Sequence, residues 1–110
     1  MKGARLVFAG ALMAALTGCW DRFDAETWRS EAGNWQGENA RAGMVGAVRD
    51  RITPGTPRDD VRALLGAPDS SEPDADLYVL GRAQYGVDFE MLEVSYDARA
   101  HVVALTLRRS

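Results

Sequence analysis

The chain has 110 residues, a formal net charge of −3, one cysteine (Cys19) and one histidine (His101). An acidic chain lacks the basic surface that sequence-independent nucleic-acid binding requires, and a lone cysteine excludes an internal disulfide or a cysteine-rich zinc site. A lone histidine has no histidine partner for a metal centre, so we expect no nucleic-acid partner, no metal and no cofactor.

Residues 1–18 have the three parts of a secretory signal, which are a positive start, an apolar run and small residues before a cleavage point. These parts are Lys2 and Arg5, then Leu6 to Leu16, then Thr17 and Gly18. The apolar run is much shorter than the ~20 residues of a membrane-spanning helix. With Cys19 directly after Gly18, the segment resembles a bacterial lipoprotein signal with its lipobox. We predict cleavage between Gly18 and Cys19; an uncleaved anchor helix or a buried core helix is the alternative.

The lipobox resemblance implies that Cys19 is the mature N-terminus and carries acyl chains such as palmitate. Several acyl chains, at about 0.8 kcal/mol per buried CH₂, hold a protein stably on a membrane. Trp20 follows the cysteine, whereas an aspartate at this place resembles an inner-membrane retention signal in Gram-negative sorting. The sequence therefore predicts the periplasmic face of the outer membrane. The inner membrane is the alternative, because Asp21 comes one place later.

Residues 19–40 have mixed polarity and are predicted to form a lipidated tether with a possible short helix. Asp24 is a suitable N-cap for such a helix, although glycines interrupt the segment further on. Trp20, Trp28 and Trp35 recur at close to two helical turns. Two interpretations stay open: these tryptophans reach a membrane or a partner protein, or they cover the edge of a small core.

A domain over residues 41–110 is predicted to begin with two helices. The first carries an apolar stripe at helical period, with Arg41 and other charged residues on the opposite side. The stripe consists of Met44, Val45, Val48 and Ile52. The second helix has Thr56 as its N-cap and Gly66 as its left-handed C-terminal cap. Its buried face consists of Val61, Leu64 and Leu65.

The rest of the domain is predicted to be an acidic loop followed by strands. Residues 69–76 lack the central glycine and the distal glutamate of a calcium-binding loop, so we interpret them as solvated. From Leu77 the hydrophobic period changes to two, which predicts strands over 77–80, 89–96 and 101–108. The sequence therefore predicts an α+β domain with two helices packed on one face of a three-stranded antiparallel meander sheet (αα-βββ).

The second predicted helix and the last strands also carry a family motif. Residues 52–68 read ITPGTPRDDVRALLGAP, which resembles the hallmark G-x-[ST]-x-x-x-V-x-x-x-[LF]-G-x-P of a known family, and residues 92–97 read LEVSYD. Over roughly residues 45–110 the chain resembles the BamE (SmpA/OmlA) domain, although Ala100 stands where a turn glycine is common. The resemblance implies the αα-βββ fold. An accessory role in outer-membrane β-barrel assembly is its narrower implication, since many small lipoproteins carry this domain without that role.

We expect a non-enzymatic, lipid-anchored envelope protein that binds another protein. The sheet face away from the helices is half apolar, which is typical of an interaction surface. The residues predicted there are Tyr78, Met91, Val102, Ala104 and Thr106. The tryptophan segment folding over this face is the competing interpretation, and an inhibitor- or ligand-binding periplasmic module is the alternative function. An enzyme is not expected, because Glu90 and Glu93 fall on opposite strand faces and no catalytic motif is present.

Overall fold

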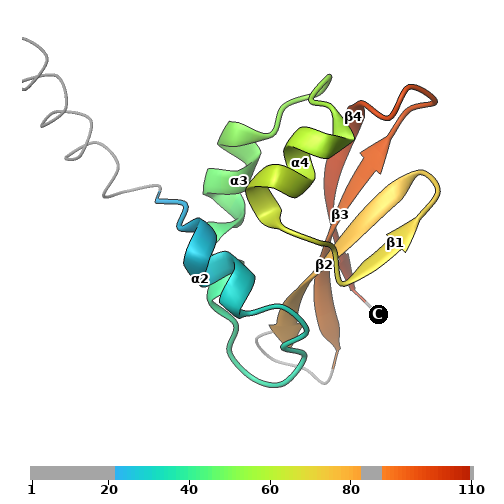
Figure 1. Ribbon diagram of the computed structural model, residues 1–110. Helices are drawn as coiled ribbons and strands as arrows, with labels where there is room; N and C mark the ends of the chain where they lie inside the picture. Colours follow the sequence, from blue (N-terminus) through green and yellow to red (C-terminus); the bar gives the residue numbers. More distant parts are fainter. Residues whose placement is uncertain (1–21, 83–87, 110) are drawn as a thin grey trace, which may run out of the picture.

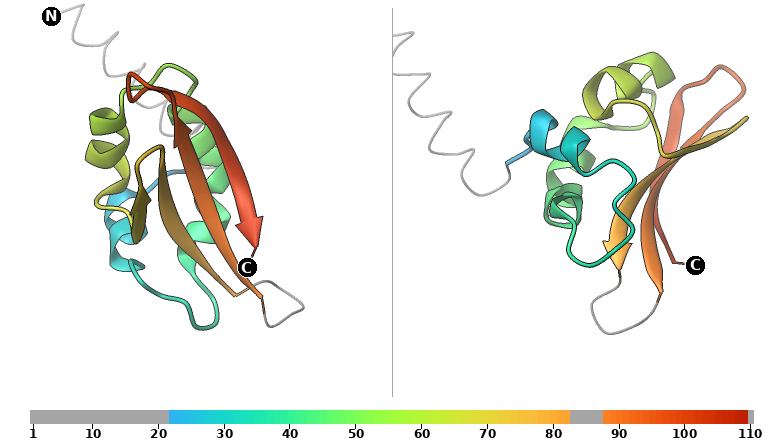
Figure 2. Two further views of the ribbon diagram at one scale, coloured as in Figure 1. Left: turned by 90° about the vertical axis from the view of Figure 1, so that its right-hand side faces the viewer. Right: turned by 60° about the horizontal axis from the view of Figure 1, so that its bottom comes forward.

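The computed structural model describes residues 22–82 and 88–109. Four antiparallel strands form one sheet in the order β1-β2-β3-β4, and helices cover one of its faces (Figure 1). The strands are β1 (Ser70–Glu72), β2 (Ala75–Arg82), β3 (Phe89–Tyr96) and β4 (Val102–Arg109). The helices are α2 (Ala25–Ser30), the 3₁₀ helix η1 (Ala40–Met44), α3 (Val45–Arg51) and α4 (Arg58–Leu65). Both views in Figure 2 show the opposite face of the sheet without a helix over it.

The predicted arrangement of two helices on three strands is wrong. The fold is α+β, but the sheet has four strands and the described residues contain three short α-helices. The additional strand, β1, lies in the segment predicted to be a solvated loop. Its three residues are all exposed, so it has no alternation of apolar residues from which a strand could be predicted. Pairing with β2, from Ser70 opposite Leu77 to Glu72 opposite Ala75, makes it a strand.

Helix α2 is the additional helix, and it joins residues 22–40 to the domain. The Asp24 carboxylate caps it by accepting hydrogen bonds from the amides of Glu26 (3.1 Å) and Thr27 (3.2 Å). Trp28 is fully buried, with its ring centroid 6.0 Å from that of Tyr78. The short helix expected within residues 19–40 is therefore α2. The described part of that segment, however, packs into the domain instead of forming a tether.

The other two α-helices keep the predicted apolar faces but differ at their starts. Met44, Val48 and Ile52 are buried, and the first turns of this predicted helix form η1. Helix α4 begins after Pro57 without a side-chain cap, because the Thr56 hydroxyl bonds to Thr53 instead: it accepts from the Thr53 amide (3.3 Å) and donates to the Thr53 carbonyl (2.7 Å).

The C-terminal end of α4 follows the sequence prediction. Gly66 has φ of 80°, a backbone conformation that other residues rarely adopt, and it ends the helix.

An irregularity in the register between β3 and β4 decides on which face Val102 lies. Ser95 pairs with Ala104 and Tyr96 with Val102, so Val103 is an extra residue in β4. A bulge of this kind shifts the alternation by one residue, so residues before and after it do not follow one common alternation of faces. Val102 therefore lies on the helix side next to Tyr96. The strict alternation assumed from the sequence placed it on the open face.

A buried carboxylate, Asp76, joins α4 to the sheet. It accepts hydrogen bonds from Arg58 Nη2 (2.7 Å), Arg62 Nη2 (2.8 Å) and the Tyr96 hydroxyl (2.9 Å). Burial alone would raise the pKa of Asp76, but the bonds from Arg62, Arg58 and Tyr96 together hold the pKa well below its usual range. Burial and the bond to Asp76 raise the pKa of the Tyr96 hydroxyl. Asp76 is therefore a charged structural partner of α4.

A second buried ion pair joins the N-terminal helices to the sheet. Arg41, predicted to lie on the polar side of its helix, is buried and pairs with Asp69 at 2.7 Å. Its Nε donates to the Trp28 carbonyl (2.7 Å), and its guanidinium carbon lies 4.9 Å from the Trp28 ring centroid. The prediction for Arg41 is wrong because its partner, Asp69, comes from a distant part of the chain.

Candidate partner-binding surface

Strand β4 presents an open edge with apolar side chains. It is the last strand of the sheet. Its first residue, Val102, is paired on the outer side, where its carbonyl accepts from the Gly55 amide (2.8 Å) and its amide donates to the Thr56 carbonyl (2.8 Å). Beyond Val102, no strand pairs with the outer side within residues 22–82 and 88–109. Val103 is 54% exposed and Leu107 is 48% exposed. On the outer side, the carbonyl of Leu105 accepts a hydrogen bond from Arg49 Nη1 (3.3 Å). An exposed edge of this kind is a template for pairing with another chain.

On the other side of the sheet, the part of β2 that the short edge strand β1 leaves uncovered is, by contrast, occupied. Beyond the short β1, the β2 residue Val79 donates its amide to Asp69 Oδ2 (2.8 Å) and accepts from Arg41 Nη1 at its carbonyl (3.2 Å). Further along, the Arg82 amide donates to the carbonyl of Gly37 (3.3 Å). Side chains and a loop thus occupy pairing groups of β2 beyond the three-residue strand β1, and β4 beyond Val102 is the longer stretch of edge that has no strand beside it in the described structure.

The structure divides the residues predicted to form a partner surface into two groups. Ala104 and Thr106 are exposed on the face away from the helices, and Met91 on the same face is half-buried. Tyr78 and Val102 lie in the core and do not belong to any exposed surface. Tyr78 pairs with Leu92 on the helix side, and its hydroxyl donates to the carbonyl of Gly66 (2.9 Å).

Two residues that the sequence did not single out complete this region. Leu107 lies opposite the buried Leu92, but the helices do not extend far enough to cover it. Val103 is exposed at the β4 bulge. The alternation of β4 showed that both are strand residues, but it carries no information on how far the helices reach. We define the β4 surface by its exposed residues Val103, Ala104, Thr106 and Leu107.

Charged residues confine the apolar part of β4 to its middle. Beyond Leu107, Arg108 pairs with Glu93 (2.9 Å) and Arg109 pairs with Glu90 (3.2 Å), both across to β3. Exposed pairs of this type contribute about 0.2–1 kcal/mol. Charges on an edge also discourage unselective pairing, so they limit the stretch of β4 that is open to pairing.

The tryptophan segment contacts only one end of the open face. Trp35 packs edge-on against Phe89 at the start of β3, with ring centroids 5.5 Å apart. Ala104 and Thr106 nevertheless remain exposed. Of the two interpretations of the tryptophans, covering the core fits Trp28, which is buried, and Trp35 packs at one end of the sheet. Trp20 lies outside the described residues.

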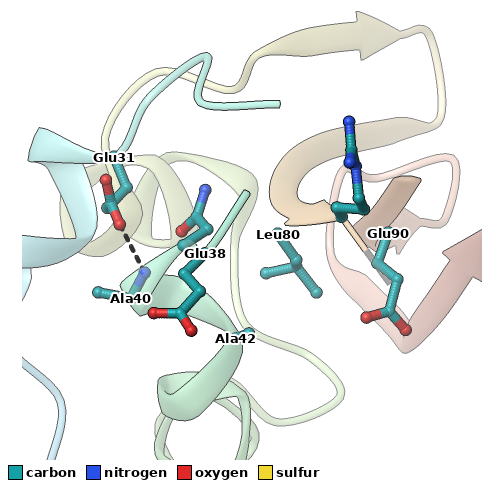
Figure 3. A pocket seen from close by; sticks show the side chains of 8 residues that line it. Glu31, Glu38, Ala40, Ala42, Leu80 and Glu90 are labelled. Carbon is teal, nitrogen blue, oxygen red and sulfur yellow. Dashed lines mark hydrogen bonds between the residues drawn. The ribbon is translucent and has the colours of Figure 1, made fainter. Parts of the chain in front are cut away.

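A groove of about 660 Å³ lies between the loop before η1 and the ends of β2 and β3 (Figure 3). Its lining residues are Glu31, Glu38, Asn39, Ala40, Ala42, Leu80, Arg82 and Glu90. Two of its carboxylates already have structural partners, since Glu31 accepts from the amide of Ala40 and Glu90 pairs with Arg109. The groove therefore combines charges of both signs, and at least two of its carboxylates have structural roles.

Within the described residues, no cluster of three or more histidine, cysteine, aspartate or glutamate side chains could hold a metal ion. The most strongly perturbed carboxylate, Asp76, is fully buried under two arginines, where a substrate could not reach it. Perturbed titratable groups are candidates for catalysis when they line a cleft, and Asp76 does not line the groove.

The predicted lipidation site and the cleavage position lie outside the described residues. Gly18 and Cys19 precede Arg22, where the described chain begins. Among the described helices, none has the length and apolar character needed to cross a membrane.

Comparison with protein-family models, with characterised proteins and with solved structures found no match for this chain. The resemblance to the BamE domain and the lipobox at Cys19 therefore stay predictions from the sequence.

Proposed function

We propose that this protein is a lipid-anchored component of the bacterial cell envelope whose folded domain binds an extended segment of another protein along β4. The single observation that supports the binding role most directly is the contrast between the two sheet edges. Arg41, Asp69 and Gly37 occupy the part of the β2 edge that β1 leaves uncovered, whereas β4 beyond Val102 has no strand on its outer side within the described residues and exposes Val103 and Leu107.

The chemistry of the β4 surface fits an added strand. Main-chain hydrogen bonds supply affinity when a peptide extends a sheet, and pockets for alternate side chains supply specificity. Leu107 on the helix side and Thr106 on the open side would contact successive side chains of such a peptide, because neighbouring strand residues point to opposite faces. Arg49, already bonded to the Leu105 carbonyl, would have to move aside or bond to the peptide.

Site-specific crosslinking in cells tests the binding role. A photoreactive residue at Thr106 or Leu107 should capture one or a few envelope proteins. The same residue at Asp59, which is exposed on α4 and lies outside the β4 surface, should capture none of them. Equal capture patterns at the three positions, or no capture at Thr106 and Leu107, would contradict a partner-binding β4 surface.

The narrower proposal, an accessory role in outer-membrane β-barrel assembly, is supported by the motif in residues 52–68 alone. Its test is purification of the lipidated protein from detergent-solubilised outer membranes. Recovery of barrel-assembly subunits would support this role, and recovery of other partners without them would exclude it. Recovery of one periplasmic enzyme would favour the alternative, an inhibitor module.

A further inference from the structure

The folded domain begins very close to the predicted lipid anchor. Phe23 packs against the core, with its ring centroid 6.0 Å from that of Trp28. The guanidinium of Arg51, at the end of α3, lies 5.6 Å from the Phe23 ring centroid. The next amide, that of Asp24, donates to the sulfur of the buried Met44 (3.4 Å). The chain is therefore fixed in the domain from Phe23 onward, four residues after Cys19.

This connection is short compared with the domain. Four residues span at most about 14 Å when fully extended. A domain of this length has a radius of gyration of about 12 Å and is about 30 Å across. A connection shorter than the domain's width keeps one end of the domain at the bilayer surface and prevents free rotation.

The position of the first described residues decides which end that is. In Figure 1 the chain joins the molecule at α2, on the helix side, and the sheet lies on the far side. The right-hand view of Figure 2 shows the same order from another direction. The helical layer therefore separates the point of attachment from the open face of the sheet.

We propose that the anchored domain lies with the start of α2 and the end of α3 against the lipid headgroups and with the open sheet face directed away from the membrane. This inference rests on the proposed lipidation of Cys19. The short connection, and not attraction between charges, sets this orientation, because the exposed side chains at this end carry charges of both signs. These side chains are Arg22, Arg51 and Glu26. In this orientation the β4 surface stays accessible to a soluble or membrane-embedded partner while the protein is anchored.

Fluorescence quenching on vesicles tests the orientation. The lipidated full chain is placed on phosphatidylcholine vesicles in which a minor fraction of lipids carries a nitroxide on the headgroup. A fluorophore is attached at Glu26→Cys, near the start of α2, or at Thr106→Cys on the open face; both native residues are exposed. We expect quenching to be several-fold stronger at position 26 than at position 106. Equal quenching, or stronger quenching at position 106, would overturn the proposal.

Two controls separate this inference from the anchoring on which it rests. If the lipidated chain fails to float with vesicles, or if Cys19→Ser floats equally well, the proposed anchor is wrong. If the chain floats but the two labels are quenched equally, only the orientation is wrong. Arg22→Cys provides a second label position at the same end if the Glu26→Cys protein unfolds.

Lengthening the connection tests the physical reason. Twenty Gly/Ser residues inserted between Trp20 and Asp21 would add a root-mean-square distance of about 25 Å. We expect flotation to remain unchanged and quenching at position 26 to fall to the level at position 106. Undiminished quenching at position 26 would show that the domain itself adheres to the surface. The short connection would then not be the cause of the orientation.

Discussion

Replacement of Asp76 by asparagine should destabilise the domain more than any other single loss of charge among its described residues. Asparagine has nearly the same size as aspartate but no charge. Its NH₂ group is a hydrogen-bond donor, and it would face side chains that are themselves donors. Those donors are Arg58, Arg62, Tyr96 and Ser71. The variant therefore leaves two guanidinium groups without their buried counterion.

The structure sets the expected magnitude. Removing one partner of a buried ion pair costs about 3–5 kcal/mol. The side chain of Arg62 is 40% exposed and that of Arg58 is 18% exposed, so both regain some contact with water. We therefore expect a loss near the lower end, about 3 kcal/mol, which corresponds to a fall in Tm of about 12–24 °C for a domain of this size.

The pH dependence gives an independent check. The folded chain lowers the pKa of Asp76, through hydrogen bonds that outweigh the effect of burial. A lowered pKa in the folded state adds stability that is present above the unfolded pKa of about 3.9 and is lost as the pH falls further. The difference in unfolding free energy between wild type and Asp76→Asn should therefore be constant from about pH 7 to pH 5 and shrink below about pH 4.

Thermal and urea unfolding of a chain that starts at Trp20, followed by circular dichroism, measures both effects. Asp74→Asn is the matched control, because Asp74 loses the same charge two residues away in an exposed turn, and its stability should stay close to that of wild type. A loss of less than about 1 kcal/mol for Asp76→Asn at neutral pH would refute the role of Asp76 as a buried counterion. So would a difference that is unchanged at low pH.

Three further predictions concern the β2 edge, the anchor and the β4 edge. Gly81→Ala should destabilise by at least about 2 kcal/mol in urea unfolding, because a non-glycine residue at φ of +94° is strained and its Cβ would lie 2.9 Å from the Gly37 carbonyl oxygen. Gly55→Ala, at φ of +97° with nothing within 4 Å of the added Cβ, has the strain without the contact, and an equal loss in both would contradict tight packing of that loop. Cys19→Ser should move the protein from the membrane fraction to the soluble fraction; retention after a salt wash would place the anchor elsewhere. Leu107→Asp should abolish partner capture at Thr106 while leaving Tm within a few degrees of wild type, since Leu107 is half exposed; undiminished capture would exclude β4 pairing.

Local sequence patterns were sufficient for the elements that depend on neighbouring residues. β3 has the predicted bounds, because apolar and polar residues alternate from Leu92 to Tyr96 and no glycine or proline interrupts residues 89–96. Gly66 ends α4 as predicted, since a positive φ is a requirement of that one position. The open-face positions of Ala104 and Thr106 also follow from alternation alone. For each of these features, the physical cause lies within a few residues of the chain.

The tertiary structure decided the features that depend on residues far apart in sequence. β1 is a strand only because β2 pairs with it, and the positions of Arg41 and Asp76 are decided by ionic partners 28 and 14 to 18 residues away. The bulge that directs Val102 into the core appears only in the register between β3 and β4. The exposure of Leu107 depends on where the helices end above the sheet. By itself, the sequence determined which stretches could form strands and helices and predicted a lipid anchor. Long-range packing determined which edge of the sheet stayed open and how closely the domain follows Cys19, because both depend on what the distant parts of the chain cover.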